Sequence, residues 1–214
     1  MSATMLALYP ELFAGGAIIA GLPHGAAASM PQAFEAMRAQ GPAPRDGRIR
    51  QAAPGVQRWP RISILHGTGD QTVDVGNADR LLTQWLDVHG LPARPDSDLA
   101  DGRRRHRTWA DDAGEVRVDD HRIEAMGHGT PLDPARDPLG AVGPFMLDVG
   151  FSSTAWLIEA WGLGGGRERR ARPHPAKGSD AAPTQRASVP PMSGSAGGVQ
   201  ALIETALRRA GRLP

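Results

Sequence analysis

Short continuous apolar runs alternate with segments of helical periodicity up to residue 163. Residues 17–22 and 62–66 are runs of the kind that form strands buried on both faces of a parallel sheet. Residues 107–110 and 116–126 predict two further strands, joined by a turn at 111–114. Apolar positions at helical spacing predict helices over residues 1–13, 31–40, 74–89 and 153–161. Strands that alternate with helices predict an α/β fold with a mostly parallel sheet.

This pattern ends at Gly164, where the composition changes. Residues 164–198 combine a Gly-Gly-Gly start, an arginine-rich run and a long Pro/Ser/Gly/Ala stretch. Such a segment cannot bury enough apolar surface to offset the entropy of ordering, so it predicts a disordered linker. Residues 199–214 predict a short helical tail. Residues 1–163 are therefore expected to be the folded portion, with loop structure over residues 41–60.

The charge balance gives little reason to expect a polyanionic partner. The chain carries 24 Lys and Arg against 23 Asp and Glu, so its net charge is +1. We therefore expect no nucleic-acid binding, and the basic run at 103–107 indicates a solvated loop or hairpin end. The apolar runs are too short for a membrane span, and no signal-peptide pattern opens the chain. The pattern predicts no particular oligomeric state.

Metal and redox chemistry also find little support in the composition. The chain has no cysteine, which excludes disulfides and thiolate ligands. Its seven histidines show neither an HExxH motif nor another paired spacing. We therefore expect neither a metal site nor a cofactor.

Two polar residues follow the carboxyl ends of predicted strands, where open α/β sheets carry their functional groups. Asp70 stands in a Gly-rich turn after the run 62–66, and His128 lies in Gly127-His128-Gly129 after the strand 116–126. An acid that precedes a histidine is the order of the last two triad members in α/β-hydrolases. In that chemistry His128 would accept the proton of a serine hydroxyl, and Asp70 would fix its tautomer.

Each residue also has a simpler interpretation. An aspartate in a Gly-rich turn is often only a turn former, and a histidine at a strand end is often structural. It is the occurrence of both at successive strand ends, in this order, that favours catalysis. Asp74 is better placed to cap the helix 74–89, and His24 is a weaker candidate for lining a substrate cleft.

Four segments resemble the PHB-depolymerase family of α/β-hydrolase esterases. Residues 6–23 resemble the stretch that follows the family's nucleophile elbow, residues 66–73 its acid loop, and residues 127–132 its histidine loop. Residues 143–150 and the Trp-containing helix after them resemble one branch of the family. The resemblance covers residues 1–163, which would then be the C-terminal portion of the α/β-hydrolase domain.

The resemblance implies a serine esterase that acts on hydroxyalkanoate or related carboxylic esters and is exported from the cell. The family's nucleophile lies in a Gly-x-Ser-x-Gly-Gly elbow, and no Gly-x-Ser-x-Gly occurs in this sequence. We therefore expect that elbow immediately before Met1, as in a truncated gene product. The alternative is a non-catalytic fragment or pseudoenzyme with at most a binding function.

Three serines are candidates to replace the missing nucleophile. Ser195, in Ser193-Gly194-Ser195-Ala196-Gly197-Gly198, imitates the elbow, but Pro190 and Pro191 before it argue against the strand that an elbow requires. Ser2 is expected on a helix beyond the turn, and Ser152 reads as a helix cap. None of the three is expected to act as the nucleophile.

Overall fold

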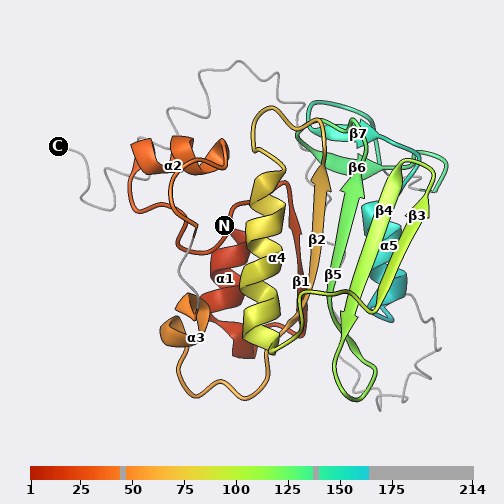
Figure 1. Cartoon of the computed structure of the whole chain (residues 1–214). Helices are drawn as coiled ribbons and strands as arrows, with labels where there is room; N and C mark the ends of the chain where they lie inside the picture. The colour runs from red at the N-terminus through yellow and green to blue at the C-terminus, as the bar shows by residue number, and fades with distance from the viewer. Residues whose placement is uncertain (44–46, 137–139, 164–214) are drawn as a thin grey trace, which may run out of the picture. The chain divides into compact units, whose positions relative to one another are not determined.

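The computed structural model describes residues 1–43, 47–136 and 140–163, which are coloured in Figure 1. The predicted linker at 164–198 and the predicted helical tail at 199–214 lie outside these residues. Those two predictions, and the domain boundary at residue 163, therefore stay predictions.

A five-stranded mixed sheet is the centre of the described part, with the strand order β1-β2-β5-β4-β3. Its strands are β1 (Gly15–Ile19), β2 (Arg61–Gly67), β3 (Ser97–Asp101), β4 (Arg104–Ala110) and β5 (Val116–Ile123). β1, β2 and β5 run parallel, whereas β4 and β3 join the sheet antiparallel. A small parallel pair consists of β6 (Thr130–Leu132) and β7 (Met146–Asp148). The predicted α/β class is confirmed.

Helices lie on both faces of this sheet (Figure 1). They are α1 (Ser2–Leu8), the 3₁₀ turn η1 (Pro10–Leu12), α2 (Met30–Met37), α3 (Arg48–Ala52), α4 (Gly76–His89) and α5 (Ser153–Ala160). α1 and α4 pack on one face, where a buried apolar core forms around Ile64, Trp85 and Val118. α5 covers the opposite face. In the described ranges no helix is both long and apolar enough to cross a membrane.

Several predicted elements have different bounds in the structure. The strand expected at 17–22 is β1, which ends at Ile19 because Ala20 takes a left-handed backbone conformation with φ 48°. The segment 41–60, expected as loop, contains the short helix α3. Asp74 accepts a hydrogen bond from the backbone N–H of Gly76 at 2.8 Å, but Val75 holds the N-cap position. Ser152 does cap α5, as predicted, by accepting from Ala155 N at 3.0 Å.

The basic run at 103–107 begins in the turn that joins β3 to β4, the hairpin end that its composition indicates, and continues along β4. Arg104, Arg105 and Arg107 belong to β4 and form ion pairs with Asp101, Asp98 and Asp120 respectively. Two of these acids, Asp98 and Asp101, belong to β3, a polar strand that apolar patterning does not reveal. Opposite charges on neighbouring antiparallel strands thus stabilise this part of the sheet.

Candidate active site

The parallel pairing of β2 with β5 brings the loops that carry Asp70 and His128 to the same edge of the sheet. The last register pair of these strands is Gly67 with Ile123. Asp70 follows the first strand and His128 the second, so both side chains lie at the carboxyl ends of neighbouring strands. This is the position that open α/β sheets use for functional groups.

Backbone hydrogen bonds tie the two loops together. Thr68 N donates to Ile123 O at 2.9 Å, and Gly69 N donates to Met126 O at 3.0 Å. The hydroxyl of Thr68 accepts from Ala125 N at 2.9 Å. The chain passes so close to Met126 O at Gly67 that a Cβ there would overlap this oxygen. The glycine therefore permits the approach that sets the two loops side by side.

The Asp70 carboxylate is buried and is held through both of its oxygens. Oδ1 accepts hydrogen bonds from the backbone N–H groups of Thr72 and Val73, at 2.9 and 2.8 Å. Oδ2 accepts from Nδ1 of His128 at 2.9 Å. Two backbone donors thus fix the plane of the carboxylate and leave its second oxygen for the imidazole. Hydrogen bonds to an ionised acceptor are the stronger ones in proteins.

His128 is half-buried, and its side chain is 28% exposed. Because Nδ1 keeps its proton and donates a hydrogen bond to Asp70, Nε2 carries the lone pair of the neutral ring. In the described ranges Nε2 has no hydrogen-bond partner, and the edge of the ring meets Phe145 at a centroid distance of 5.8 Å. The arrangement can therefore accept a proton at Nε2 and stabilise the resulting imidazolium through Asp70.

His66 is a member of this site that the sequence interpretation missed. It is fully buried in β2, its Nε2 donates to Val73 O at 2.9 Å, and the same nitrogen lies 3.4 Å from Asp70 Oδ2. Burial lowers the pKa of His66, so the ring is neutral at physiological pH. The ring therefore supports the turn that presents Asp70. Its spacing of four residues before Asp70 was the only sequence signal.

The other candidates lie apart from the Asp70–His128 pair. In the described structure His24 contacts Thr4 through its ring and pairs with Gln84 through its backbone, without contacting either member of the pair. Burial and the nearby Arg48 lower the pKa of His24. Ser2 is an exposed residue of α1, Ser152 caps α5, and Ser195 lies outside the described residues.

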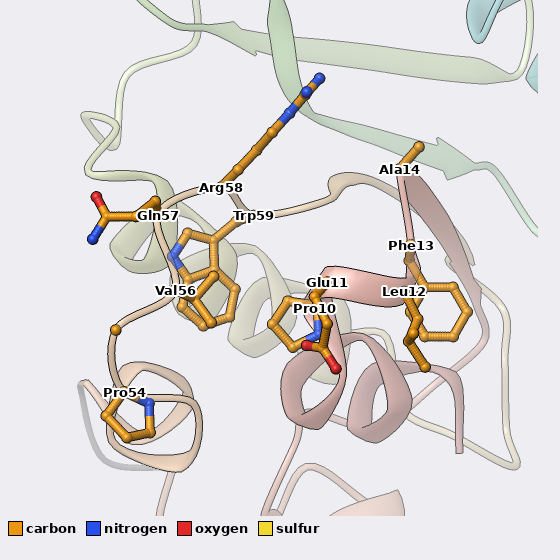
Figure 2. Close-up of a pocket in the computed structure, with 11 residues that line it drawn as sticks. Pro10, Glu11, Leu12, Phe13, Ala14, Pro54, Val56, Gln57, Arg58 and Trp59 are labelled. Carbon is orange, nitrogen blue, oxygen red and sulfur yellow. The ribbon is translucent and has the colours of Figure 1, made fainter.

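One well-formed cavity, of about 600 Å³, lies away from the candidate site. Figure 2 shows it between the segments 10–14 and 54–59, with Trp59 and Pro10 among its lining residues. These segments lead into β1 and β2, so the cavity belongs to the amino ends of those strands. Asp70 and His128 lie beyond the carboxyl ends, so the cavity is not their substrate cleft.

Comparisons with known proteins bear on the chemistry of this site. No family model matches the chain. Poly(3-hydroxyalkanoate) depolymerase C of Paucimonas lemoignei is 35% identical over 173 residues, which are 76% of this chain and 41% of that protein. Acetylxylan esterase of Coprinopsis cinerea is 32% identical over 139 residues, 61% of this chain and 37% of that protein. The chain spans less than half the length of these curated relatives.

A solved structure extends the likeness to the fold. Acetyl xylan esterase from Aspergillus awamori superimposes with a TM-score of 0.53 and 23% identity, over 64% of this chain and 53% of that one. At this identity the structural match supports the fold alone. The reaction class is supported by the sequence relatives, which are named as a depolymerase and an esterase. The two agree, and the chain is thus related to esterases of the α/β-hydrolase type.

Proposed function

We propose that this chain supplies the acid and the histidine of a serine-type carboxylic ester hydrolase. The observation that carries the proposal is the 2.9 Å hydrogen bond between His128 Nδ1 and Asp70 Oδ2 at the carboxyl ends of adjacent parallel strands. Nε2 of His128, whose side chain is 28% exposed, gives this pair a nitrogen that can accept a proton. The relation to esterases supports the same reaction class.

In this reaction His128 acts as the general base and then as the general acid. Nε2 takes the proton of a serine hydroxyl as its oxygen attacks the ester carbonyl carbon, and returns the proton to the alcohol as the carbon–oxygen bond breaks. Water then attacks the acyl-enzyme with the same help from Nε2 and releases the carboxylic acid. Asp70 keeps the ring oriented and stabilises its charged form throughout.

The nucleophile of this proposal is a serine outside the described residues. No Gly-x-Ser-x-Gly elbow occurs in the sequence, and none of the described serines hydrogen-bonds to His128. We infer that a Gly-x-Ser-x-Gly-Gly segment upstream of α1 provides both the serine and one donor of the oxyanion hole. The active protein would then be longer than this chain.

The substrate class follows from the named relatives and is also a proposal. They are a poly(3-hydroxyalkanoate) depolymerase, acetylxylan esterases and feruloyl esterases, so the chemistry they share is hydrolysis of a carboxylic ester. We infer a hydroxyalkanoate or a related short carboxylic ester as substrate. Export from the cell would give the enzyme access to a polymer.

The test compares the 214-residue chain with the longer protein encoded by its in-frame upstream sequence. We expect the longer protein to hydrolyse p-nitrophenyl butyrate and the shorter one to stay at background. His128→Ala should lower kcat/KM of the longer protein by about 10³-fold or more. Relative kcat/KM on poly(3-hydroxybutyrate), acetylated xylan and feruloyl esters then identifies the substrate.

A matched control separates loss of chemistry from loss of structure. His89→Gln changes a histidine at the far end of α4 and should keep the activity of the parent protein. Hydrolysis that survives His128→Ala would overturn the assigned role. Absence of hydrolysis by the longer protein on all these esters would overturn the function itself.

A further inference from the structure

Two polar side chains stand side by side near the carboxyl ends of β2 and β5, on the face of the sheet that α4 covers. His66 of β2 and Arg122 of β5 are register partners in the parallel pair. Side chains alternate between the two faces of a strand, and Val118, four residues before Arg122, belongs to the core under α4. Both side chains therefore lie on the side from which the loop after β2 enters α4 (Figure 1).

Each of the two side chains donates a hydrogen bond to a backbone carbonyl of that loop. His66 Nε2 donates to Val73 O at 2.9 Å, and Arg122 Nη1 donates to Val75 O at 3.3 Å. Val75 holds the N-cap position of α4, so the second bond fixes the point where the loop becomes helix. Side chains of two neighbouring strands thus hold the loop that follows Asp70 at two points.

The Arg122 guanidinium is itself fixed by carboxylates of the sheet and of α4. Its Nε donates to Asp120 Oδ1 at 2.8 Å, and its Nη2 donates to Asp79 Oδ1 of α4 at 3.0 Å. The Arg122 side chain is only 11% exposed, and the fully buried Asp120 also accepts from Arg107 at 2.7 Å. Because the donors of a guanidinium form a rigid planar fork, these bonds also set the position of the Nη1 group that reaches Val75 O.

His66 connects this support to the Asp70 carboxylate. Burial, and to a smaller degree the charge of Arg122, lowers the pKa of His66, so the ring is neutral and carries one proton. The bond to Val73 O places that proton on Nε2, which also lies 3.4 Å from Asp70 Oδ2. This oxygen accepts from His128, whereas Oδ1 accepts from Val73 N. A displacement of Val73 would therefore disturb the hydrogen bonds of both carboxylate oxygens.

We propose that His66 and Arg122 form a carbonyl clamp, a pair of positioning residues that holds Asp70 in the orientation in which its Oδ2 accepts from His128. This role rests on the proposed function, since it concerns the same Asp70–His128 pair. In the part of the chain that the structure describes, neither clamp residue hydrogen-bonds to His128, so the clamp acts through the loop. Support of this kind matters in catalysis, because a displacement of about 1 Å can lower a rate about 10²-fold.

The first test measures the loop by NMR in the 214-residue chain, so it does not depend on ester hydrolysis. In the unchanged protein His66 should be the neutral tautomer with its proton on Nε2. His66→Leu removes this donor, and hydrogen exchange of the Thr72 and Val73 amides should become about tenfold faster or more. The far-downfield proton resonance of His128 Nδ1, which reports its hydrogen bond to a carboxylate, should broaden or disappear.

A conservative substitution separates the donated hydrogen bond from the packing of the ring. His66→Gln keeps an N–H donor near the position of Nε2 and should restore most of the slow amide exchange that His66→Leu loses. A contribution of the ring to packing alone would make the two variants behave alike. Equal exchange rates in His66→Gln and His66→Leu would therefore overturn the clamp.

Arg122→Lys tests the second half of the clamp. Lysine keeps a positive charge beside Asp120 but lacks the fork that also reaches Val75 O, so exchange of the same two amides should again become faster. The matched control is Arg105→Lys, which alters an exposed ion pair with Asp98 and should leave these amides unchanged.

The second test uses the kinetics of the longer protein. Because the clamp acts through Asp70, His66→Leu and Arg122→Lys should lower kcat about 10- to 100-fold and leave KM within about twofold. Arg105→Lys should keep both constants.

Unchanged amide exchange and an unchanged His128 Nδ1 resonance in both His66→Leu and Arg122→Lys would overturn the clamp. If His66→Leu fails to fold, Arg122→Lys decides through the same amides, and a His66 proton on Nδ1 in the unchanged protein overturns the clamp. Absence of hydrolysis by the longer protein would overturn the proposed function, and the NMR results on the 214-residue chain would still decide whether the loop is clamped.

Discussion

At the scale of single residues, the candidate active site depends on the different hydrogen-bond donors that the two carboxylate oxygens of Asp70 accept. Oδ1 of Asp70 accepts two backbone N–H groups of its own turn, and Oδ2 accepts from His128. The hydrogen bonds inside the turn therefore do not involve His128, whereas the second oxygen accepts from His128 and lies 3.4 Å from His66 Nε2. Asp70 thus contributes to orientation and charge at His128 as well as to the structure of its own loop.

Asp70→Asn separates these two contributions. The amide oxygen can still accept from Thr72 and Val73, so the free energy of unfolding should change by no more than about 1 kcal/mol. The amide nitrogen would face His128 Nδ1, favour the wrong tautomer and remove the negative charge. We expect kcat of the catalytically complete protein to fall about 10³- to 10⁴-fold. Urea denaturation and p-nitrophenyl butyrate kinetics on the same preparation check both values, and an unchanged kcat would contradict the orienting role.

At the scale of elements, the close contact between the loops after β2 and β5 places the acid beside the histidine. Gly67→Ala would put a Cβ onto the carbonyl oxygen of Met126, which is backbone and cannot rotate away. We expect a loss of about 2 kcal/mol or more in the free energy of unfolding, together with weaker activity because the His128 loop moves.

Gly143→Ala is the matched control for that substitution. A Cβ at Gly143 would meet no heavy atom within 4 Å, and the residue has no left-handed backbone conformation. Its effect on the free energy of unfolding should stay within about 1 kcal/mol, with a slight gain from reduced chain entropy. Equal losses for both variants, measured by urea denaturation, would refute the close contact as the cause.

The elements that apolar patterning predicted are those whose burial comes from apolar side chains. β2 and α4 lie near their predicted bounds, because contacts with the apolar core dictate the spacing of their apolar residues. β3 escaped prediction because it is a mostly exposed, polar strand without an apolar pattern, and its pairing with β4 depends on the register between the two strands. α3 is too short for a periodic signal.

The same division applies to the residues of the candidate site. Asp70 and His128 were predictable because each follows a strand and stands in a glycine-rich turn, both of which are local features. His66 and Arg122 were not, because their roles depend on which strands are neighbours. Topology, and not sequence spacing, brings these side chains together.

At the scale of the whole described structure, the two faces of the sheet are stabilised differently. The face under α1 and α4 holds the apolar core, whereas the face under α5 buries Ser63, Asp119 and His121. Two further histidines are shielded from solvent, His66 fully and His89 partly, and burial lowers the pKa of both. At these histidines the unfolded chain binds protons at a higher pH than the folded chain does. Their lowered pKa therefore reduces the free energy of unfolding in acid.

His89 allows this acid sensitivity to be measured at one residue that belongs neither to the Asp70–His128 pair nor to the carbonyl clamp. Burial, opposed by a hydrogen bond to Pro60 O, lowers its pKa from 6.5 to about 4. Between these values the unfolded state is protonated and the folded state is not, so stability is complete above pH 6.5 and is lost as the pH falls towards 4. The full shift corresponds to about 3 kcal/mol. His89→Gln keeps a donor for Pro60 O but does not titrate, so urea denaturation from pH 7 to about pH 4 should show the unchanged protein losing up to about 3 kcal/mol more than the variant. Parallel pH dependence of the two proteins would mean that His89 is protonated equally in the folded and unfolded states.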